Sequence, residues 1–288
     1  MDKILITGHK GFIAKYVIAQ LKDQYELVFP EDNLFEMDMQ AYMKDVRPQY
    51  LIHLAWVTGV GYLDSVDNLR MVAKSIEMYE AFFNNGGKRC VYVGTEQEYK
   101  RQDVPLSETD ELAPASLYAQ CKCNLGEMLV KYSRLKNYGF VWNRLFFIYG
   151  IGEKPKRLMP AMIKSMVKGD EVSCSCRDYV RDYIHVHDVA SGIITSLFSD
   201  YIGAVNICGG NHTTIGEIGD LIASFEGAKG SIQHKTHEMC GQDYVIQGDN
   251  SLLRSLGWTP RYTLEEGVRE EYTYYQRMYE NEQKFLDE

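Results

Sequence analysis

The sequence lacks long hydrophobic runs. No stretch approaches the roughly 18 consecutive apolar residues that a membrane-spanning helix needs. A strand-like run begins as early as Lys3, so no secretory signal peptide is expected. The sequence therefore predicts a cytoplasmic protein with no membrane partner.

Positive charge is also scarce. Lys and Arg number 31 against 40 Asp and Glu, which gives a net charge of −9. A general nucleic-acid binder normally carries a basic surface, so nucleic acid is not an expected partner. An acidic chain still binds an anionic ligand where it supplies a local basic pocket or a helix N-terminus.

Cysteine motifs for metal or redox chemistry are absent. The seven cysteines include two Cys-x-Cys pairs, Cys121/Cys123 and Cys174/Cys176, but no C-x-x-C spacing typical of a zinc knuckle or a redox motif. We therefore expect no metal site. The cysteines are expected to be reduced and to serve as small apolar residues.

What the sequence does contain is a glycine turn near its N-terminus. The apolar run Lys3–Ile6 leads into Gly8 and Gly11, and a helical pattern follows over Tyr16–Lys22. Gly8 permits a tight turn, Gly11 lets the backbone approach a pyrophosphate, and Ala14 keeps the helix close to the sheet. The spacing G-x-x-G-x-x-A departs from the standard G-x-G-x-x-G, but its place between a strand and a helix predicts nucleotide binding.

The choice between NAD and NADP stays open at this point. Glu31 or Asp32, beyond the predicted strand Tyr25–Phe29, would bind the adenosine ribose and favour NAD. Lys10, inside the glycine turn, is instead a cation suited to a ribose 2′-phosphate, which favours NADP. The two indications conflict.

A second pattern joins Tyr118 and Lys122. They lie four residues apart on a predicted helix over 116–135, so their side chains share one face. The nearby ammonium is expected to lower the pKa of the phenol from about 10 toward the working range. Thr95 follows the predicted strand Arg89–Val93 and would hold a substrate oxygen beside the phenol. Tyr-x-x-x-Lys also occurs by chance as two solvated side chains, so the pattern gains meaning only beside a hydride carrier.

The order of elements predicts the fold class. Apolar strands alternate with helical segments up to Gly150, which is typical of a Rossmann-type doubly wound α/β fold with a parallel sheet. We expect a dinucleotide-binding domain over residues 1–155 and a smaller α/β substrate-binding lobe over residues 156–288. Residues 183–208 are expected to return to the first domain.

Nine segments together resemble one known family, the extended short-chain dehydrogenase/reductases of the NAD-dependent epimerase/dehydratase group, which act mainly on nucleotide sugars. The segments are TGHKGFIA (7–14), Asp38, HLAW (53–56), GTEQEY (94–99), ETDELAPASLYAQCK (108–122), RLFFIYG (144–150), RDYIHVHDVA (181–190), NICGG (206–210) and LGWTPRYTLEEGV (256–268). They follow the family order and cover nearly the whole chain.

The resemblance implies roles for individual residues. Contacts to an NAD(P)H cofactor would come from Gly8, Lys10, Gly11, Phe12, Ile13, Asp38, Met39, Leu54, Ala55, Trp56, Tyr118 and Lys122. Of these, Asp38 and Met39 would lie by the adenine, and Lys122 would bond the nicotinamide ribose. Thr95, Tyr118 and Lys122 would be the catalytic trio. Thr95, Glu96, Arg157 and Arg181 would contact the nucleotide-sugar substrate, the two arginines at its phosphates. A homodimer through the helices near 64–85 and 116–135 is also implied.

The active-site loop narrows the reaction. The 4,6-dehydratases of the family carry Thr-Asp-Glu, whereas this chain has Thr95-Glu96-Gln97, and the Gln97 amide cannot take a proton. The GTEQEY run resembles the GTxxEY run of 4-ketoreductases. The resemblance thus implies NAD(P)H-dependent reduction of a 4-keto (deoxy)sugar nucleotide, with Tyr118 as the proton donor. The alternatives are a C4-epimerase, a 4,6-dehydratase, a non-catalytic NAD(P)-binding protein and a dehydrogenase of another substrate.

Overall fold

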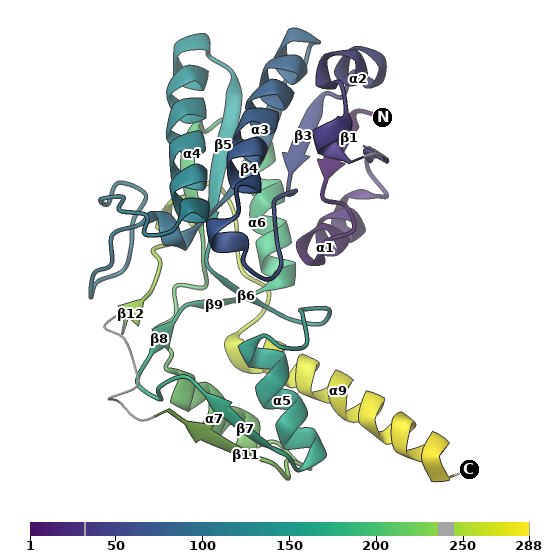
Figure 1. The fold of residues 1–288 in the computed structure, drawn as a ribbon, viewed down its shortest axis with the longest axis vertical. Coiled ribbons are helices and arrows are strands. Elements are labelled where there is room, and N and C mark those ends of the chain that lie inside the picture. The colour runs from purple at the N-terminus through teal and green to yellow at the C-terminus, as the bar shows by residue number, and fades with distance from the viewer. Residues whose placement is uncertain (32, 236–244, 288) are drawn as a thin grey trace.

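The computed structural model describes residues 1–31, 33–235 and 245–287. Figure 1 shows a larger part built on one sheet and, below it, a smaller part that ends in the C-terminal helix. Within the described ranges, every helix is too short or too polar to pass through a lipid bilayer.

The larger part is organised around a six-stranded sheet in the order β10-β5-β4-β3-β1-β2, in which all neighbouring strands run parallel. The strands, in chain order, are β1 (Lys3–Thr7), β2 (Glu26–Val28), β3 (Tyr50–His53), β4 (Arg89–Thr95), β5 (Gly139–Leu145) and β10 (Gly203–Ile207). A parallel sheet whose strands are connected by helices is the expected doubly wound fold. The predicted fold class is therefore confirmed.

Both faces of the sheet are buried, because successive side chains of a strand point to opposite faces. Ile4 and Ile6 of β1 pack in one apolar cluster, and Leu5 between them packs in another. β4 repeats the division, with Val91 in the first cluster and Tyr92 in the second.

Helices cover the two faces separately. The first cluster contains side chains of α1 and α6, and the second contains side chains of α2, α3 and α4, which stand in front of the sheet in Figure 1. These helices are α1 (Phe12–Leu21), α2 (Met39–Val46), α3 (Asp67–Asn84), α4 (Leu117–Lys136) and α6 (Val186–Phe198), with short 3-10 turns η1 (Leu34–Glu36), η2 (Tyr62–Asp64) and η3 (Glu96–Glu98).

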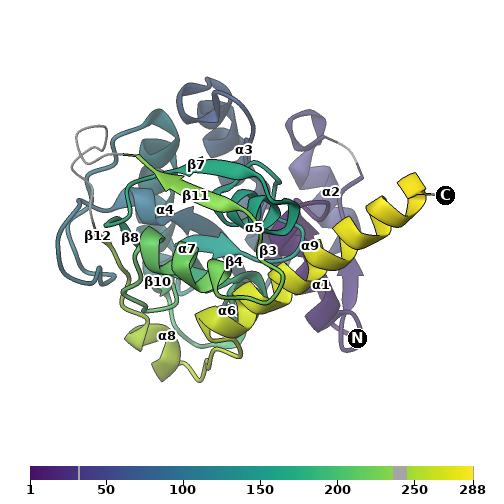
Figure 2. The ribbon, with the colours of Figure 1, turned by 90° about the horizontal axis from the view of Figure 1, so that it is seen from below.

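The smaller part has its own apolar cluster, to which Met162, Ile218 and Val268 contribute. Its elements are α5 (Leu158–Lys168), β7 (Glu171–Cys174), β8 (Val180–Arg181), α7 (Ile215–Ala223), β11 (Ser231–His234), β12 (Val245–Ile246) and α9 (Leu264–Asp287). The short helix α8 (Ser251–Ser255) instead packs with the large sheet, where Leu253 joins the first cluster. Figures 1 and 2 show α9 leaving the junction of the two parts and projecting outward.

The chain passes between the parts more than once. β6 (Phe147–Tyr149) pairs with β9 (Tyr183–His185) at the junction. After β9, α6 packs on the large sheet and β10 pairs with β5. The boundary near residue 155 stays a prediction, but residues 186–207 lie with the sheet.

Two local expectations need correction. The first helix begins at Phe12, directly after the glycine turn, and not at Tyr16, because Gly11 already has the extended backbone of an N-cap.

The state of the cysteines also differs in part from the expectation. Five of them are free and buried, as expected for small apolar residues: Cys90, Cys121, Cys123, Cys174 and Cys208. Cys176 is disulfide-bonded, so the expectation of reduced cysteines is wrong at that position. Cys240 lies outside the described residues.

Candidate active site

The glycine turn lies at the carboxyl end of β1. Gly8 has a φ of 68°, in the left-handed region that favours glycine, and the Gly11 N–H donates to the Gly8 oxygen at 2.8 Å. Gly11 is the N-cap of α1, and no side-chain cap hydrogen bond is present at this helix start in the described chain. The first turn of α1 also contains no acidic residue. The N–H groups of that turn therefore remain available to an anion.

A cavity of about 560 Å³ opens beside this turn. Its lining includes Gly8, Lys10, Ala55 and Trp56 from the predicted cofactor site, together with Glu31. Predicted cofactor residues from two neighbouring strand ends are thus brought together. Sequence reasoning missed Asn33, Leu34 and Phe35, which line the same cavity from η1 and its N-cap; no local pattern marks them.

Eight predicted cofactor residues do not line the cavity: Gly11, Tyr118, Lys122 and five others. The Asp38 carboxylate accepts from the Ala41 N–H at 3.0 Å and caps α2, and Met39 is 1% exposed in the core. Phe12 packs edge-on against Tyr16, while Ile13 and Leu54 pack at the edge of an apolar cluster. Their predicted contacts with a cofactor remain predictions.

Gly8 offers a direct test of the turn. A Cβ at this position would lie 2.8 Å from the Ala55 nitrogen, so Gly8→Ala is expected to displace the β3 end from the turn and lower dinucleotide affinity about tenfold or more, which corresponds to about 1.4 kcal/mol. Dinucleotide titration by calorimetry measures this effect. Gly61→Ala is the matched control, since Gly61 also has a positive φ of 75° but nothing within 4 Å of its Cβ. Equal losses in both variants would contradict the assigned role of Gly8.

The catalytic candidates meet where β4 ends. Thr95 is the last residue of β4, and Ser116 caps α4 by accepting from the Ala119 N–H, which places Tyr118 in the first turn and Lys122 in the next. Tyr118 lies near enough to Thr95 for the threonine side chain to lower the pKa of the phenol. The Thr95 hydroxyl donates to Glu96 at 2.9 Å. Tyr118 also lies edge-on to Tyr62, with ring centroids 5.0 Å apart.

The electrostatics of Tyr118 differ from the sequence expectation. Burial raises the pKa of the phenol, and Tyr62 and Glu96 raise it further, while the Thr95 side chain opposes the rise. The predicted lowering by Lys122 is therefore wrong for the cofactor-free chain. The Lys122 ammonium instead donates to the Val93 carbonyl at 2.6 Å and lies 3.8 Å from the centroid of Trp56. Burial lowers the pKa of Lys122 to about 7.

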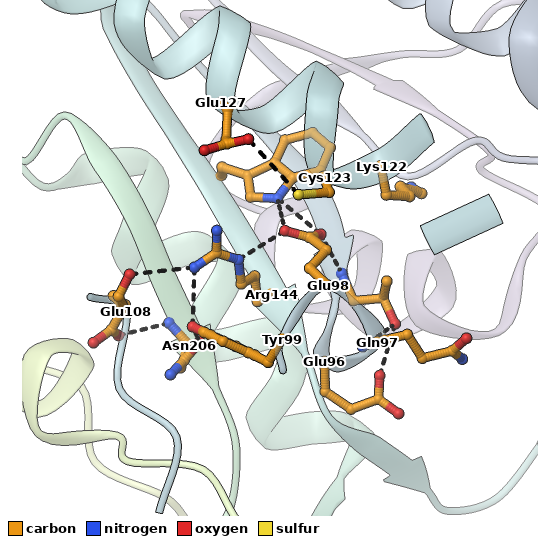
Figure 3. A network of polar contacts seen from close by, with 12 residues as sticks. Glu96, Gln97, Glu98, Tyr99, Glu108, Lys122, Cys123, Glu127, Arg144 and Asn206 are labelled. Atoms are coloured by element: carbon orange, nitrogen blue, oxygen red, sulfur yellow. Dashed lines mark hydrogen bonds and ion pairs between the residues drawn. The ribbon is translucent and has the colours of Figure 1, made fainter. Parts of the chain in front are cut away.

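The rest of the GTEQEY run forms a buried polar network (Figure 3). Glu98 is 0% exposed and accepts from the Thr95 N–H at 2.9 Å, from the Trp142 indole at 3.1 Å and from Arg144 at 2.7 Å. Arg144 also donates to the Tyr99 hydroxyl. In Figure 3 the Gln97 side chain points away from the Glu98–Arg144 pair. Glu98 thus holds the strand end that carries Thr95.

The predicted substrate arginines line a second cavity, of about 260 Å³, in the smaller part. Arg157 donates to Glu153 at 3.2 Å, and the Arg181 guanidinium lies 4.6 Å from the Tyr179 ring centroid. Burial raises the pKa of Glu153 to about 7, although Arg157 opposes the rise. Burial also raises the pKa of Glu96, and Arg101 and Arg181 oppose that rise. Arg181 therefore acts electrostatically on the residue beside Thr95.

A cavity larger than these two lies elsewhere. It has a volume of about 860 Å³, and its lining from α4 and the loop over 108–114 contains none of the predicted site residues. Size alone therefore does not locate the chemistry, and the converging polar groups at the β4 end are the better guide.

Comparisons with known proteins identify a matching family and relatives that resemble this chain. The family model described as "NAD dependent epimerase/dehydratase family" matches residues 4–208. The chain is 24% identical to the putative GDP-L-fucose synthase 2 of Arabidopsis thaliana, over 95% of this chain and 91% of that protein. It is 24% identical to the GDP-L-colitose synthase of Yersinia pseudotuberculosis, over 95% of this chain and 97% of that protein.

Solved structures share the fold. The UDP-glucose 4-epimerase of Thermotoga maritima, solved with UDP-glucose, superposes with a TM-score of 0.85 at 22% identity and covers 96% of this chain and 99% of its own. RMD of Pseudomonas aeruginosa, complexed with NADPH, superposes with a TM-score of 0.84 at 19% identity, over 96% of this chain and 100% of its own.

Proposed function

The chain belongs to the NAD dependent epimerase/dehydratase family, and from this premise we propose that it reduces the 4-keto group of a nucleotide-linked (deoxy)sugar with NAD(P)H. Membership makes it an NAD(P)-dependent enzyme. The observation that carries the proposal is the meeting of Thr95, Tyr118 and Lys122 at the β4 end, followed by Gln97 where a dehydratase has a carboxylate.

The residues around the glycine turn fit a dinucleotide. The backbone at Gly8 lies so close to Ala55 that a side chain would clash, and the uncapped start of α1 faces the same region. In our proposal Gly8, Gly11 and the first N–H groups of α1 hold the pyrophosphate. A reduced nicotinamide held there would supply a hydride to the carbonyl carbon.

Tyr118 acts in this proposal as a general acid. Burial keeps the phenol protonated at neutral pH, which is the form that can give a proton to the alkoxide as it develops. The Thr95 hydroxyl bonds the same oxygen, and together they form a preorganised site for the negative charge. The Lys122 ammonium stabilises the phenolate that remains after transfer.

A dehydratase would need both an acid and a base for the removal of water. Glu96 is 6% exposed and buried beside Thr95, but the neighbouring position is the Gln97 amide. An amide does not take up a proton at physiological pH. The absence of a carboxylate at position 97 therefore favours reduction over dehydration.

A C4-epimerase would use the same three residues, Thr95, Tyr118 and Lys122. The likeness to an epimerase of known structure keeps this reaction as the alternative.

In our proposal the second cavity binds the phosphates of the substrate through Arg157 and Arg181. Arg157→Met is expected to raise the KM for the nucleotide sugar about 10-fold to 100-fold, because a charge-assisted hydrogen bond contributes about 1.5–3 kcal/mol. The KM for the cofactor should not change. Arg177→Met is the matched control, since Arg177 is exposed and pairs with Asp220 outside this cavity. A rise in the cofactor KM alone would contradict the assignment.

We also propose a homodimer formed through α3 and α4. These neighbouring helices and the α3 N-cap expose large apolar side chains that a monomer would leave in water: Val66, Leu69, Met128, Tyr132 and Leu135. Light scattering should give twice the chain mass of 33.1 kDa. A monomer at micromolar concentration would contradict this.

The reaction is tested with a panel of substrates. The protein is incubated with dTDP-, CDP-, GDP- and UDP-linked 4-keto-6-deoxy sugars and either NADH or NADPH, while the absorbance of the reduced cofactor is followed. Loss of one reduced cofactor for each 4-hydroxy sugar formed supports the reductase. Interconversion of C4 epimers without added reduced cofactor would support the epimerase instead.

A further inference from the structure

Trp56 lies directly over the ammonium of the proposed catalytic lysine. Lys122 Nζ is 3.8 Å from the centroid of the Trp56 ring, well within the range at which a cation is attracted to an aromatic face. The same ammonium donates to the Val93 carbonyl at 2.6 Å. Trp56 follows β3 and Lys122 belongs to α4, so two segments far apart in sequence meet at this contact.

The orientation of the indole is fixed by a buried polar anchor. The Trp56 Nε1–H donates to Asn68 Oδ1 at 2.8 Å. Asn68 is 0% exposed, and its amide donates in turn to the Tyr62 oxygen at 2.6 Å and the Ser65 oxygen at 3.0 Å. Because both ends of the Asn68 amide are engaged, the ring cannot turn without the loss of a buried hydrogen bond.

The charge on Lys122 has few other supports. Lys122 is 2% exposed, and within the described chain no carboxylate lies within ion-pair distance of its ammonium. Burial lowers its pKa to about 7, while the charge of Glu98 opposes that change. The titratable groups that act on the Lys122 ammonium are Glu98 from η3 and His53 from β3. Burial lowers the pKa of His53 to about 3, so the imidazole is neutral. The rings of Trp56 and Trp142 both favour the charged form, and the Trp56 ring centroid, at 3.8 Å from the ammonium, is closer than that of Trp142 at 5.8 Å.

Trp56 contacts this lysine and also lines the proposed cofactor cavity. Lys122 itself does not line that cavity. The indole also lies edge-on to Tyr118, with ring centroids 6.4 Å apart. One side chain thus contacts the cavity, the lysine and the phenol.

We propose that Trp56 is a positioning residue, whose indole face keeps the Lys122 ammonium charged and in place next to Tyr118. The inference rests on the proposed function for its catalytic meaning, but the contact itself does not depend on turnover. Loss of the indole face would leave the amine neutral over more of the physiological pH range. The phenolate formed after proton transfer would then lose its cationic neighbour.

The proposal is tested by a titration of Lys122 in the cofactor-free protein. The NMR signal of its ¹³C-labelled Cε, assigned through its loss in Lys122→Met, is followed against pH. In Trp56→Leu the midpoint is expected to fall by about one pH unit, a difference of about 1.4 kcal/mol. In Trp56→Phe, which keeps an aromatic face, the midpoint should fall by less than half as much.

A second variant covers the case in which Trp56→Leu does not fold. Tetrafluorotryptophan at position 56 keeps the shape and the N–H of the ring but withdraws electrons from its face, so the midpoint should fall as in Trp56→Leu. An unchanged midpoint with the fluorinated ring, or equal shifts in Trp56→Leu and Trp56→Phe, would overturn the proposal.

The kinetics separate this inference from the proposed function. In an active reductase, Trp56→Leu should move the basic limb of the pH profile of kcat to lower pH, because activity needs the protonated lysine and is lost as pH rises through its pKa. A shifted titration in a protein that reduces no keto-sugar would contradict the function and leave the positioning role intact. Turnover of the keto-sugar together with an unshifted Lys122 titration in Trp56→Leu would support the function and contradict the positioning role.

Discussion

Replacement of Tyr118 by Phe is expected to lower kcat for ketone reduction by about 10²-fold to 10⁴-fold, the range that a positioned general acid contributes. The phenylalanine keeps the ring that packs against Tyr62 and Trp56 but has no proton to give. The dissociation constant of NAD(P)H should change less than threefold, because Tyr118 is not part of the glycine turn or of the cavity beside it. Stopped-flow single turnovers and fluorescence titration of the cofactor measure the two quantities.

Tyr62→Phe is the matched control for that substitution. Tyr62 contacts Tyr118 edge-on and loses the same hydroxyl, but it has no assigned proton-transfer role, so its kcat should fall less than about 10-fold. If Tyr118→Phe stayed active, or if Tyr62→Phe lost as much activity, the assignment of the proton donor would be wrong.

The second large effect concerns stability. Glu98→Gln is expected to lower the free energy of unfolding by about 3–5 kcal/mol, because removal of one partner leaves the other charge buried and unpaired. Glu98 and Arg144 have side chains 0% and 5% exposed and an N···O distance of 2.7 Å. Urea unfolding measures the loss as a lower midpoint with an unchanged slope.

An exposed pair is the control for this prediction. Glu265→Gln breaks the Glu265–Arg269 pair on α9, whose side chains are 60% and 56% exposed, and should change stability by less than about 1 kcal/mol. Similar losses in Glu98→Gln and Glu265→Gln would contradict the account of the buried network. Glu98→Gln should also reduce kcat, since Glu98 accepts from the Thr95 N–H.

Sequence reasoning predicted the arrangement of candidate residues where local spacing decides the geometry. A separation of four residues put Tyr118 and Lys122 on one face of α4, and Ser116 caps that helix by accepting from the Ala119 N–H. A strand followed by glycines and a helix likewise located the cavity that contains Gly8. These features follow from backbone geometry, which neighbouring residues determine.

The parts that failed depend on partners distant in the chain. The pKa of Tyr118 rises because of burial and of Tyr62, which comes from a loop whose path the sequence does not specify. The adenine contact of Asp38 stays a prediction, because its carboxylate accepts from the nearby Ala41 N–H and spacing alone does not separate a helix cap from an adenine contact.

Glu98 and Arg144 are 46 residues apart, and no local sequence pattern predicts that their side chains pair. An arginine within an apolar strand is nevertheless a usable signal, because a buried guanidinium requires an acidic partner.

The most direct test of the central claim follows the hydride. The protein is given a 4-keto sugar nucleotide and reduced cofactor that carries deuterium at C4 of the nicotinamide, and the product is analysed by mass spectrometry and NMR. The account predicts one deuterium at C4 of each 4-hydroxy sugar and loss of one reduced cofactor for each product. Formation of the C4 epimer of a 4-hydroxy sugar with no deuterium and no loss of added cofactor would contradict it.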